Sequence, residues 1–211
     1  MIDVHAPEHR ISGKRDFFVH LFTITIGLLI ALGLENAAEA WHHRNQRIEA
    51  EENIRVELEK NRAYVEQGLP KVRAERDQVI RAMKILETRS RNQPADNAGG
   101  LQLRFEQSPM EDAAWRTASS TGVLSYMPYA EVQRFSAAYK EQQEIDAASQ
   151  KALEDYLEIG SFVGSTSQLQ TMDAAQATDA LPIVRHAVAD LNGMLALAAG
   201  AEGAYKDALG K

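Results

Sequence analysis

The chain has one long, mainly hydrophobic run near the N-terminus, and in later segments hydrophobic residues recur at helical spacing. The run covers residues 17–34, reads FFVHLFTITIGLLIALGL and contains no charged residue. A helix rises about 1.5 Å per residue, so the run would be roughly 27 Å long, close to the ~30 Å hydrocarbon core of a bilayer. The pattern predicts a transmembrane helix over residues 17–34, preceded by a short tail over residues 1–16.

Both flanks of this run carry side chains that suit the headgroup region of a membrane. The predicted membrane-interface residues are Lys14, Arg15, Trp41, His42, His43 and Arg44. Two other interpretations of the run stay open. A buried core helix of this length usually carries a polar stripe, and a cleaved signal peptide has a shorter apolar region of about 7–15 residues. The sequence favours an uncleaved signal anchor, with the lipid bilayer as its partner.

The orientation of this anchor follows from the basic residues near each end. Arg10, Lys14 and Arg15 precede the run, whereas only Arg44 and Arg47 follow it at a similar distance. Because Lys and Arg close to a span resist translocation, the tail is predicted to stay in the cytoplasm. The rest of the chain would then cross the inner membrane, which places the C-terminal domain in the periplasm.

Small residues recur every four positions within the run, at Thr23, Gly27 and Ala31. In a helix this spacing places them on one face, where small side chains let two helix backbones approach closely. Small residues are common in spans, so chance explains such a strip equally well. The strip is a candidate helix-association face, and it indicates a homo-oligomer or a protein partner.

Residues 35–91 have the composition and periodicity of a long helix. Apolar residues form a stripe along one face and charged residues fill the other: Ile54, Leu58, Val65, Leu69, Val72, Val79, Met83 and Leu86. The sequence Gly68-Leu69-Pro70 should kink or divide the helix, because proline removes a backbone donor and clashes with the preceding turn. Residues 35–91 are therefore predicted to form a long helix or a kinked helix pair. We expect two helical segments, of which the first is continuous with the span.

Turn-forming residues over 91–107 separate this helix from a second helical region over residues 108–211. Ser108 fits an N-cap and Glu111 completes a capping box, so a helix is expected to begin there and to end near Gly122. A longer helix should open at Pro128, and a final alanine-rich helix should follow Pro182. The predicted fold class is all-α. The soluble part should be a bundle of four to five helices, in which residues 108–211 pack on the long helix.

The charge of the chain and its lack of known motifs exclude several classes of function. The chain has 23 Lys and Arg against 30 Asp and Glu, a net charge of -7, which argues against a nucleic-acid partner. It contains no cysteine, and no nucleotide-binding or hydrolase motif is present. The spacing Glu39-x-x-His42 occurs once, whereas a di-iron bundle needs two such motifs. No catalytic, cofactor or metal site is predicted, and the chain is not predicted to be an enzyme.

Two further sets of residues are candidates for a catalytic or ligand-binding site. His186 has Asp190 one turn away, and this pair is interpreted as a surface contact in preference to a catalytic dyad. An aromatic cluster surrounds Gly122 and could line a ligand pocket or fill the core where two helices meet: Trp115, Tyr126, Tyr129, Phe135 and Tyr139. The core interpretation is favoured.

The opening of the chain resembles a group of uncharacterised bacterial single-pass inner-membrane proteins. The likeness rests on residues 5–45, through HAP at 5–7, RDF at 15–17, TITIGLLIA at 23–31, GLE at 33–35 and HHR at 42–44. Beyond residue 45 it is looser, through Trp115, Gly122, the Met127-Pro128 pair and Tyr139. The resemblance implies an inner-membrane anchor and a helical domain, and it implies no activity.

The sequence therefore favours a membrane-anchored, non-enzymatic module that binds a protein partner or itself as part of an envelope scaffold. The stripe and the small-residue strip support association. The alternatives are a ligand-sensing bundle with the aromatic cluster as its pocket, and an enzyme.

Overall fold

The computed structural model describes residues 13–95, 109–162, 169 and 171–210. These residues form the helices α1 (Lys14–Ser90), α2 (Ala113–Ser120), α3 (Tyr129–Phe162) and α5 (Ala174–Leu209), with a 3-10 turn η1 (Val123–Tyr126). No strand occurs in the described part of the chain, which confirms the all-α prediction. The chain divides into two compact units, Met1–Ile48 and Glu49–Lys211, and α1 contributes to both.

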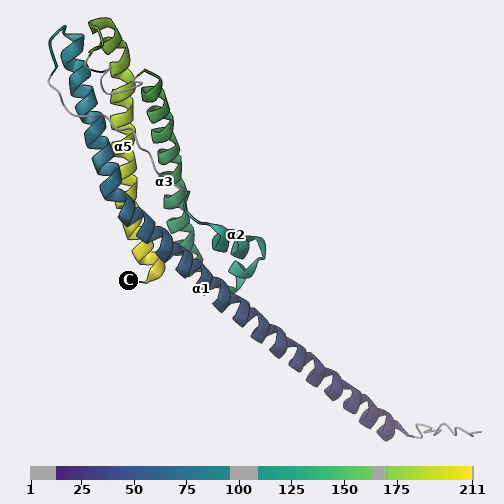
Figure 1. The fold of residues 1–211 in the computed structure, drawn as a ribbon. Coiled ribbons are helices and arrows are strands. Elements are labelled where there is room, and N and C mark those ends of the chain that lie inside the picture. Colours follow the sequence, from purple (N-terminus) through teal and green to yellow (C-terminus); the bar gives the residue numbers. More distant parts are fainter. Residues whose placement is uncertain (1–12, 96–108, 163–168, 170, 211) are drawn as a thin grey trace, which may run out of the picture. The chain divides into compact units, whose positions relative to one another are not determined.

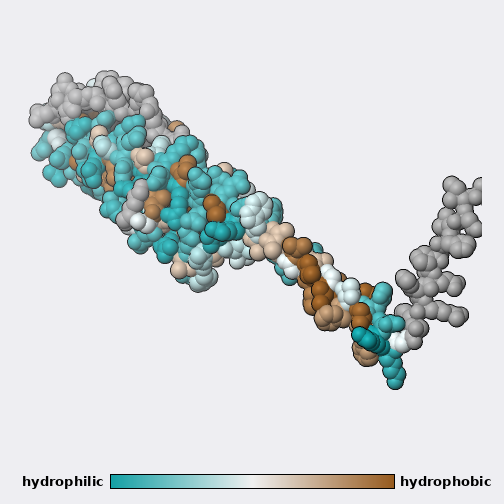
Figure 2. Space-filling model, turned by 90° about the horizontal axis from the view of Figure 1, so that it is seen from below, coloured by the Kyte–Doolittle hydropathy of each residue, from teal (hydrophilic) through white to brown (hydrophobic). Residues whose placement is uncertain are grey.

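In the first unit, α1 carries the apolar run as uninterrupted helix. Every residue from 17 to 34 is exposed, and the most apolar 18-residue window of α1 has a mean hydropathy of 2.3 with none of it buried. This is the one helix in the described residues that is long and apolar enough to cross a membrane. Figure 2 shows hydrophobic side chains gathered on this part of α1. A core helix would be buried, so that alternative does not fit.

In the second unit, the later part of α1 lies beside α3 and α5 (Figure 1). Two contacts between residues that are far apart in the sequence show how α5 runs relative to α1. Arg55 near the start of this part donates to the carbonyl of Ala208, and Arg89 near its end donates to the carbonyl of Met172. The order is reversed between the two helices, so α5 runs antiparallel to α1. The end of α3 packs with the start of α5, and the start of α3 packs with the end of α5, so these two helices form a long antiparallel pair.

Two hydrophobic clusters fill the interior of this second unit. One gathers the second half of α1, the end of α3 and the start of α5, and its fully buried members include Val79, Leu86, Ala152, Leu169, Val184 and Leu191. The other gathers the Ile54 region of α1, α2, η1, the start of α3 and the end of α5, including Leu58, Phe135, Tyr139 and Tyr205. The predicted stripe of α1 lies in these clusters: Ile54, Leu58, Val79 and Leu86 are buried, and Val65, Leu69, Val72 and Met83 are half-buried.

The helix does not divide at Pro70. The two helical segments expected over residues 35–91 are not observed, since α1 is a single helix from Lys14 through Ser90. Pro70 is exposed, whereas Leu69 and Val72 pack against the two clusters. Apolar packing on both sides of the proline offsets the roughly 3 kcal/mol that proline costs inside a helix.

The helix expected to begin at Ser108 begins later, at Ala113, with Asp112 as its N-cap residue. Ser108 lies outside the described residues, and Glu111 does not form a capping box. Its backbone N–H donates instead to Asn61 Oδ1 of α1 at 3.0 Å, and its carbonyl accepts from Asn61 Nδ2 at 2.6 Å. Side chains of a distant helix therefore replace the local cap. The predicted end is confirmed, because Gly122 follows α2 with a left-handed φ of 76°.

The last helix also begins at a different residue from the predicted one. α5 starts at Ala174, and Pro182 lies within it on an exposed position. Asp173 is the N-cap, and it forms a reciprocal capping box with Gln176. This signal was present in the sequence but less visible than the proline. The start of α3 directly after Pro128 agrees with the prediction. Leu101, Leu103 and Phe105 alternate with polar residues, a pattern that predicts a brief extended segment, and they lie outside the described residues.

Candidate functional site

The predicted membrane-interface residues lie at both ends of the apolar run of α1. Lys14 and Arg15 occupy the first turn of the helix, and Trp41, His42 and Arg44 are exposed beyond the run. His43 Nε2 lies 3.3 Å from Glu39 Oε1. Glu39 therefore lies beside His43, the histidine one turn later on α1.

The candidate association face is also on the exposed surface of α1. Thr23, Gly27 and Ala31 are all exposed, and a side chain added at Gly27 would meet no atom within 4 Å. The hydroxyl of Thr23 donates to the carbonyl of Val19 at 2.9 Å, and that of Thr25 to the carbonyl of Leu21 at 2.8 Å. Both hydroxyls are thus satisfied within the helix, as a hydrocarbon environment requires.

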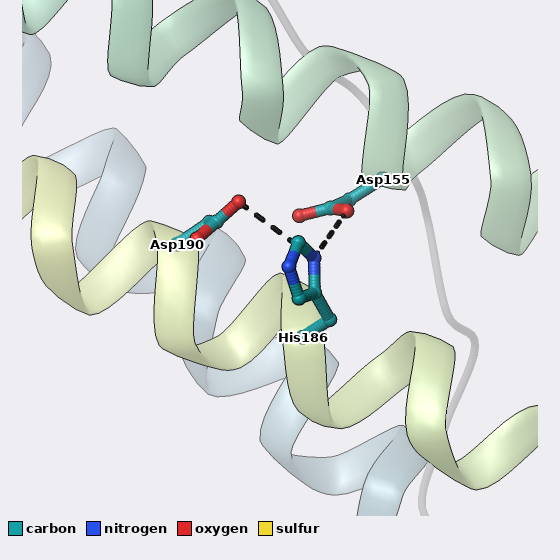
Figure 3. Close-up of side chains that lie close together, drawn as sticks. All are labelled: Asp155, His186 and Asp190. Atoms are coloured by element: carbon teal, nitrogen blue, oxygen red, sulfur yellow. Dashed lines mark hydrogen bonds and ion pairs between the residues drawn. The ribbon is translucent and has the colours of Figure 1, made fainter.

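In the second unit, α3 and α5 bring Asp155, His186 and Asp190 together (Figure 3). His186 Nδ1 forms a hydrogen bond to Asp155 Oδ1 at 2.9 Å and an ion pair with Asp190 Oδ2 at 3.7 Å. The His186 side chain is 67% exposed, whereas Asp155 as a residue is only 5% exposed. The predicted surface pair of His186 and Asp190 is present, and the structure adds a buried carboxylate as the closer partner.

The electrostatics of this cluster are unbalanced. Burial raises the pKa of Asp155, and its contact with His186 opposes that rise. The hydrogen bond and the charge of Asp155 raise the pKa of His186, and Asp190 adds to the effect. Oδ2 of Asp155 and Oδ2 of Asp190 are both buried and have no hydrogen-bond partner in the described part of the chain. One imidazole therefore faces two carboxylates with spare acceptor oxygens.

A second polar cluster lies inside the bundle, where α1 meets α2 and α3. The Glu57 carboxylate is buried and accepts from Tyr139 Oη at 2.5 Å and from the backbone N–H of Ala114 at 2.9 Å. Ala114 is the second residue of α2, so Glu57 caps the start of that helix. Burial and the adjacent Glu57 raise the pKa of Tyr139. Each group has a partner, which is typical of a structural network.

Near this network, Asp146 of α3 gives a stability prediction. Its Oδ2 accepts weakly from the Met110 N–H at 3.4 Å, and its Oδ1 is buried without a hydrogen-bond partner among the described residues. Burial raises its pKa and the charge of Asp112 adds to this, while the Met110 contact lowers it. Tyr205 also faces Asp146. Burial raises the pKa of Tyr205 to about 12, and the charge of Asp146 contributes to this rise.

A raised pKa in the folded state means that Asp146 stabilises the fold when protonated, and that this contribution is lost as pH rises through the folded pKa. We therefore expect Asp146→Asn to raise the melting temperature at neutral pH by a few degrees, roughly 1 kcal/mol. The difference should shrink as the pH falls through the raised pKa of Asp146 and the aspartate becomes protonated. Thermal melts of the full chain in detergent, with the exposed Asp179→Asn as control, measure this. A lower melting temperature at neutral pH would contradict it.

The aromatic residues around Gly122 mostly serve packing. Phe135 and Tyr139 are buried, Trp115 stacks on Tyr139 with ring centroids 5.2 Å apart, and Tyr126 and Tyr129 are exposed. An apolar cavity of about 50 Å³ lies elsewhere, beside the Gly68–Leu69 turn of α1, and none of the five aromatic residues lines it. Ligand pockets usually measure about 300–1,000 Å³.

Comparison with known proteins gives no further indication of function. No protein-family model, no curated protein and no solved structure matches the chain.

Proposed function

We propose that the protein is a single-pass inner-membrane protein that associates with a second copy through its transmembrane helix and presents its helical bundle in the periplasm. In this proposal the bundle is a non-enzymatic interaction module of the cell envelope. The observation that carries the proposal is the run of exposed apolar residues at 17–34 in α1, which has no charged residue and no covering side chain. Leaving such a surface in water would cost far more than an isolated exposed leucine does.

The role of the stripe on α1 changes once the bundle is considered. Its residues pack against α3 and α5 of the same chain, so they support the bundle itself and not an external partner. Association then rests on the strip of Thr23, Gly27 and Ala31, and on exposed apolar residues of the bundle. Leu153 and Leu157 lie one turn apart on α3 and are 42% and 66% exposed. The resemblance of residues 5–45 to bacterial membrane proteins stays a prediction.

The proposed topology is tested by a reporter fused after Lys211. A reporter that is active only in the periplasm should give signal, a cytoplasm-only reporter should stay silent, and both fusions should remain in the membrane pellet after carbonate extraction. The physical reason is that Lys14 and Arg15 lie within three residues of the run, whereas the other flank begins with Glu35 and Glu39 and reaches its first basic residue only at Arg44. The reverse reporter pattern would place the bundle in the cytoplasm. Release by carbonate would remove the anchor.

Self-association is tested by disulfide crosslinking, which this chain suits because it contains no cysteine. Ala31→Cys lies on the proposed face, and Leu29→Cys lies about 200° away around the helix and is the matched control. In isolated membranes we expect Ala31→Cys to give a covalent dimer and Leu29→Cys to remain monomeric. Equal crosslinking of both, or of neither, would contradict association through this face.

A further inference from the structure

We propose that Asp155, His186 and Asp190 form a binding site for one divalent transition-metal cation, of which Zn²⁺ fits best. The three side chains come from two neighbouring helices, Asp155 from α3 and the other two from successive turns of α5 (Figure 3). A bound cation would therefore join α3 to α5 within the second unit. This site is independent of the membrane anchor and of the proposed association face.

The geometry is close to that of a metal site. One ligand atom from each side chain can be chosen so that all three lie within 4.8 Å of one another. Tetrahedral ligands about 2.1 Å from a zinc ion are roughly 3.4 Å apart, so small side-chain rotations would close the site. In a helix, residues four apart share one face, which already points His186 and Asp190 in the same direction.

The unsatisfied carboxylate oxygens supply a second, independent reason to expect a cation. Asp155 is 95% buried, yet its Oδ2 has no hydrogen-bond partner in the described residues, and neither has Oδ2 of Asp190. In Figure 3 an oxygen of Asp190 and the oxygen of Asp155 that does not contact the imidazole point toward each other. Two carboxylates held this way repel unless a proton or a cation lies between them. His186 contacts only the other oxygen of Asp155.

The donor set selects the class of cation. A ring nitrogen with two carboxylate oxygens suits zinc and similar first-row metals, whereas Ca²⁺ and Mg²⁺ prefer six or more oxygen ligands. The exposed side of His186 leaves room for a water molecule as a fourth ligand. Glu158, one turn beyond Asp155, adds negative charge that raises the pKa of His186. The cluster is thus acidic beyond what one imidazole can neutralise.

The test is calorimetric titration of ZnCl₂ into the full chain in detergent after treatment with a chelator. We expect the native chain to bind one zinc ion that the variants Asp155→Asn, His186→Ala and Asp190→Asn either do not bind or bind at least about tenfold more weakly. The reason is that the loss of even a residue that only orients a metal ligand lowers the metal affinity about 10–100-fold. Zinc should raise the melting temperature of the native chain, and magnesium should not. His43→Ala is the control, since the carboxylate that lies 3.3 Å from His43 Nε2, that of Glu39, is exposed.

Each other outcome overturns the proposal. Equal zinc binding by the native chain and the three variants would place any bound zinc elsewhere. Loss in His186→Ala without loss in the two aspartate variants would show a lone imidazole and not a site. Loss in His43→Ala equal to that in His186→Ala would show unspecific binding to exposed histidines. Asp155→Asn is nearly isosteric and removes a buried charge, and far-ultraviolet circular dichroism checks that it and the other variants fold.

Discussion

Val79→Asp should unfold the second unit of the chain. Val79 is 1% exposed in the cluster that joins α1, α3 and α5, beside buried partners such as Leu86 and Leu191. An aspartate there would be an unpaired charge, or a neutral acid without hydrogen-bond partners, and either costs more than about 4 kcal/mol. A domain of this kind is stable by only about 5–15 kcal/mol in total. Circular-dichroism melts of the full chain in detergent should show the cooperative transition lost or lowered by many degrees.

The matched control is Val56→Asp, which makes the same change on the same helix. Val56 is 61% exposed, so its substitution should change the stability by less than about 0.5 kcal/mol. Val72→Asp should have an intermediate effect, because Val72 is half-buried and borders the small cavity beside Leu69. An unchanged melting temperature in Val79→Asp would show that the stripe on α1 does not pack in the core.

The parts of the fold that the sequence predicted are those that depend on local periodicity. The stripe from Ile54 to Leu86 repeats at helical spacing, and the face it defines is the one that packs in the two clusters. Gly122 and Pro128 marked a helix end and a helix start, because a left-handed φ and a missing N–H are properties of single residues.

The prediction was wrong where tertiary contacts override a local signal. Pro70 does not divide α1, and Pro182 lies inside α5 and does not begin it, because apolar neighbours of both prolines pack in the bundle: Leu69, Val72, Leu181 and Val184. The start of α2 was predicted too early because its cap comes from a distant helix. Glu57 accepts from the N–H of Ala114, which lies 57 residues later in the sequence. Asn61 accepts from the N–H of Glu111, which lies 50 residues later. No local pattern records such a cap.

The Asp155–His186–Asp190 cluster was half visible in the sequence. The i, i+4 spacing revealed Asp190, whereas Asp155 lies 31 residues before His186 and reaches it only because α3 and α5 pack antiparallel. A helical hairpin was predictable from two long periodic segments, but its register was not. One residue of slip on α3 would turn Asp155 by about 100° away from His186.

The second large effect is expected at Glu57, whose carboxylate joins three helices. Glu57→Ala removes the acceptor of the Tyr139 hydroxyl and of the Ala114 N–H, and leaves one buried and one half-buried donor without this partner. Hydrogen bonds to a charged group are worth about 1.5–3 kcal/mol each, so the loss should be roughly 3–5 kcal/mol. Glu57→Gln keeps the shape and one acceptor oxygen, with its amide donating to the tyrosine, and should cost about 1–2 kcal/mol.

A double-mutant cycle with Tyr139→Phe separates the two contacts of Glu57. If the carboxylate couples to the tyrosine hydroxyl, the losses of Glu57→Ala and Tyr139→Phe should sum to more than the loss of the double variant, by at least about 1 kcal/mol. Glu52→Ala, an exposed position on the same helix, is the control and should change little. Additive losses would show that Tyr139 is held by packing against Trp115 alone. The remaining cost of Glu57→Ala would then measure how strongly α1 holds the start of α2.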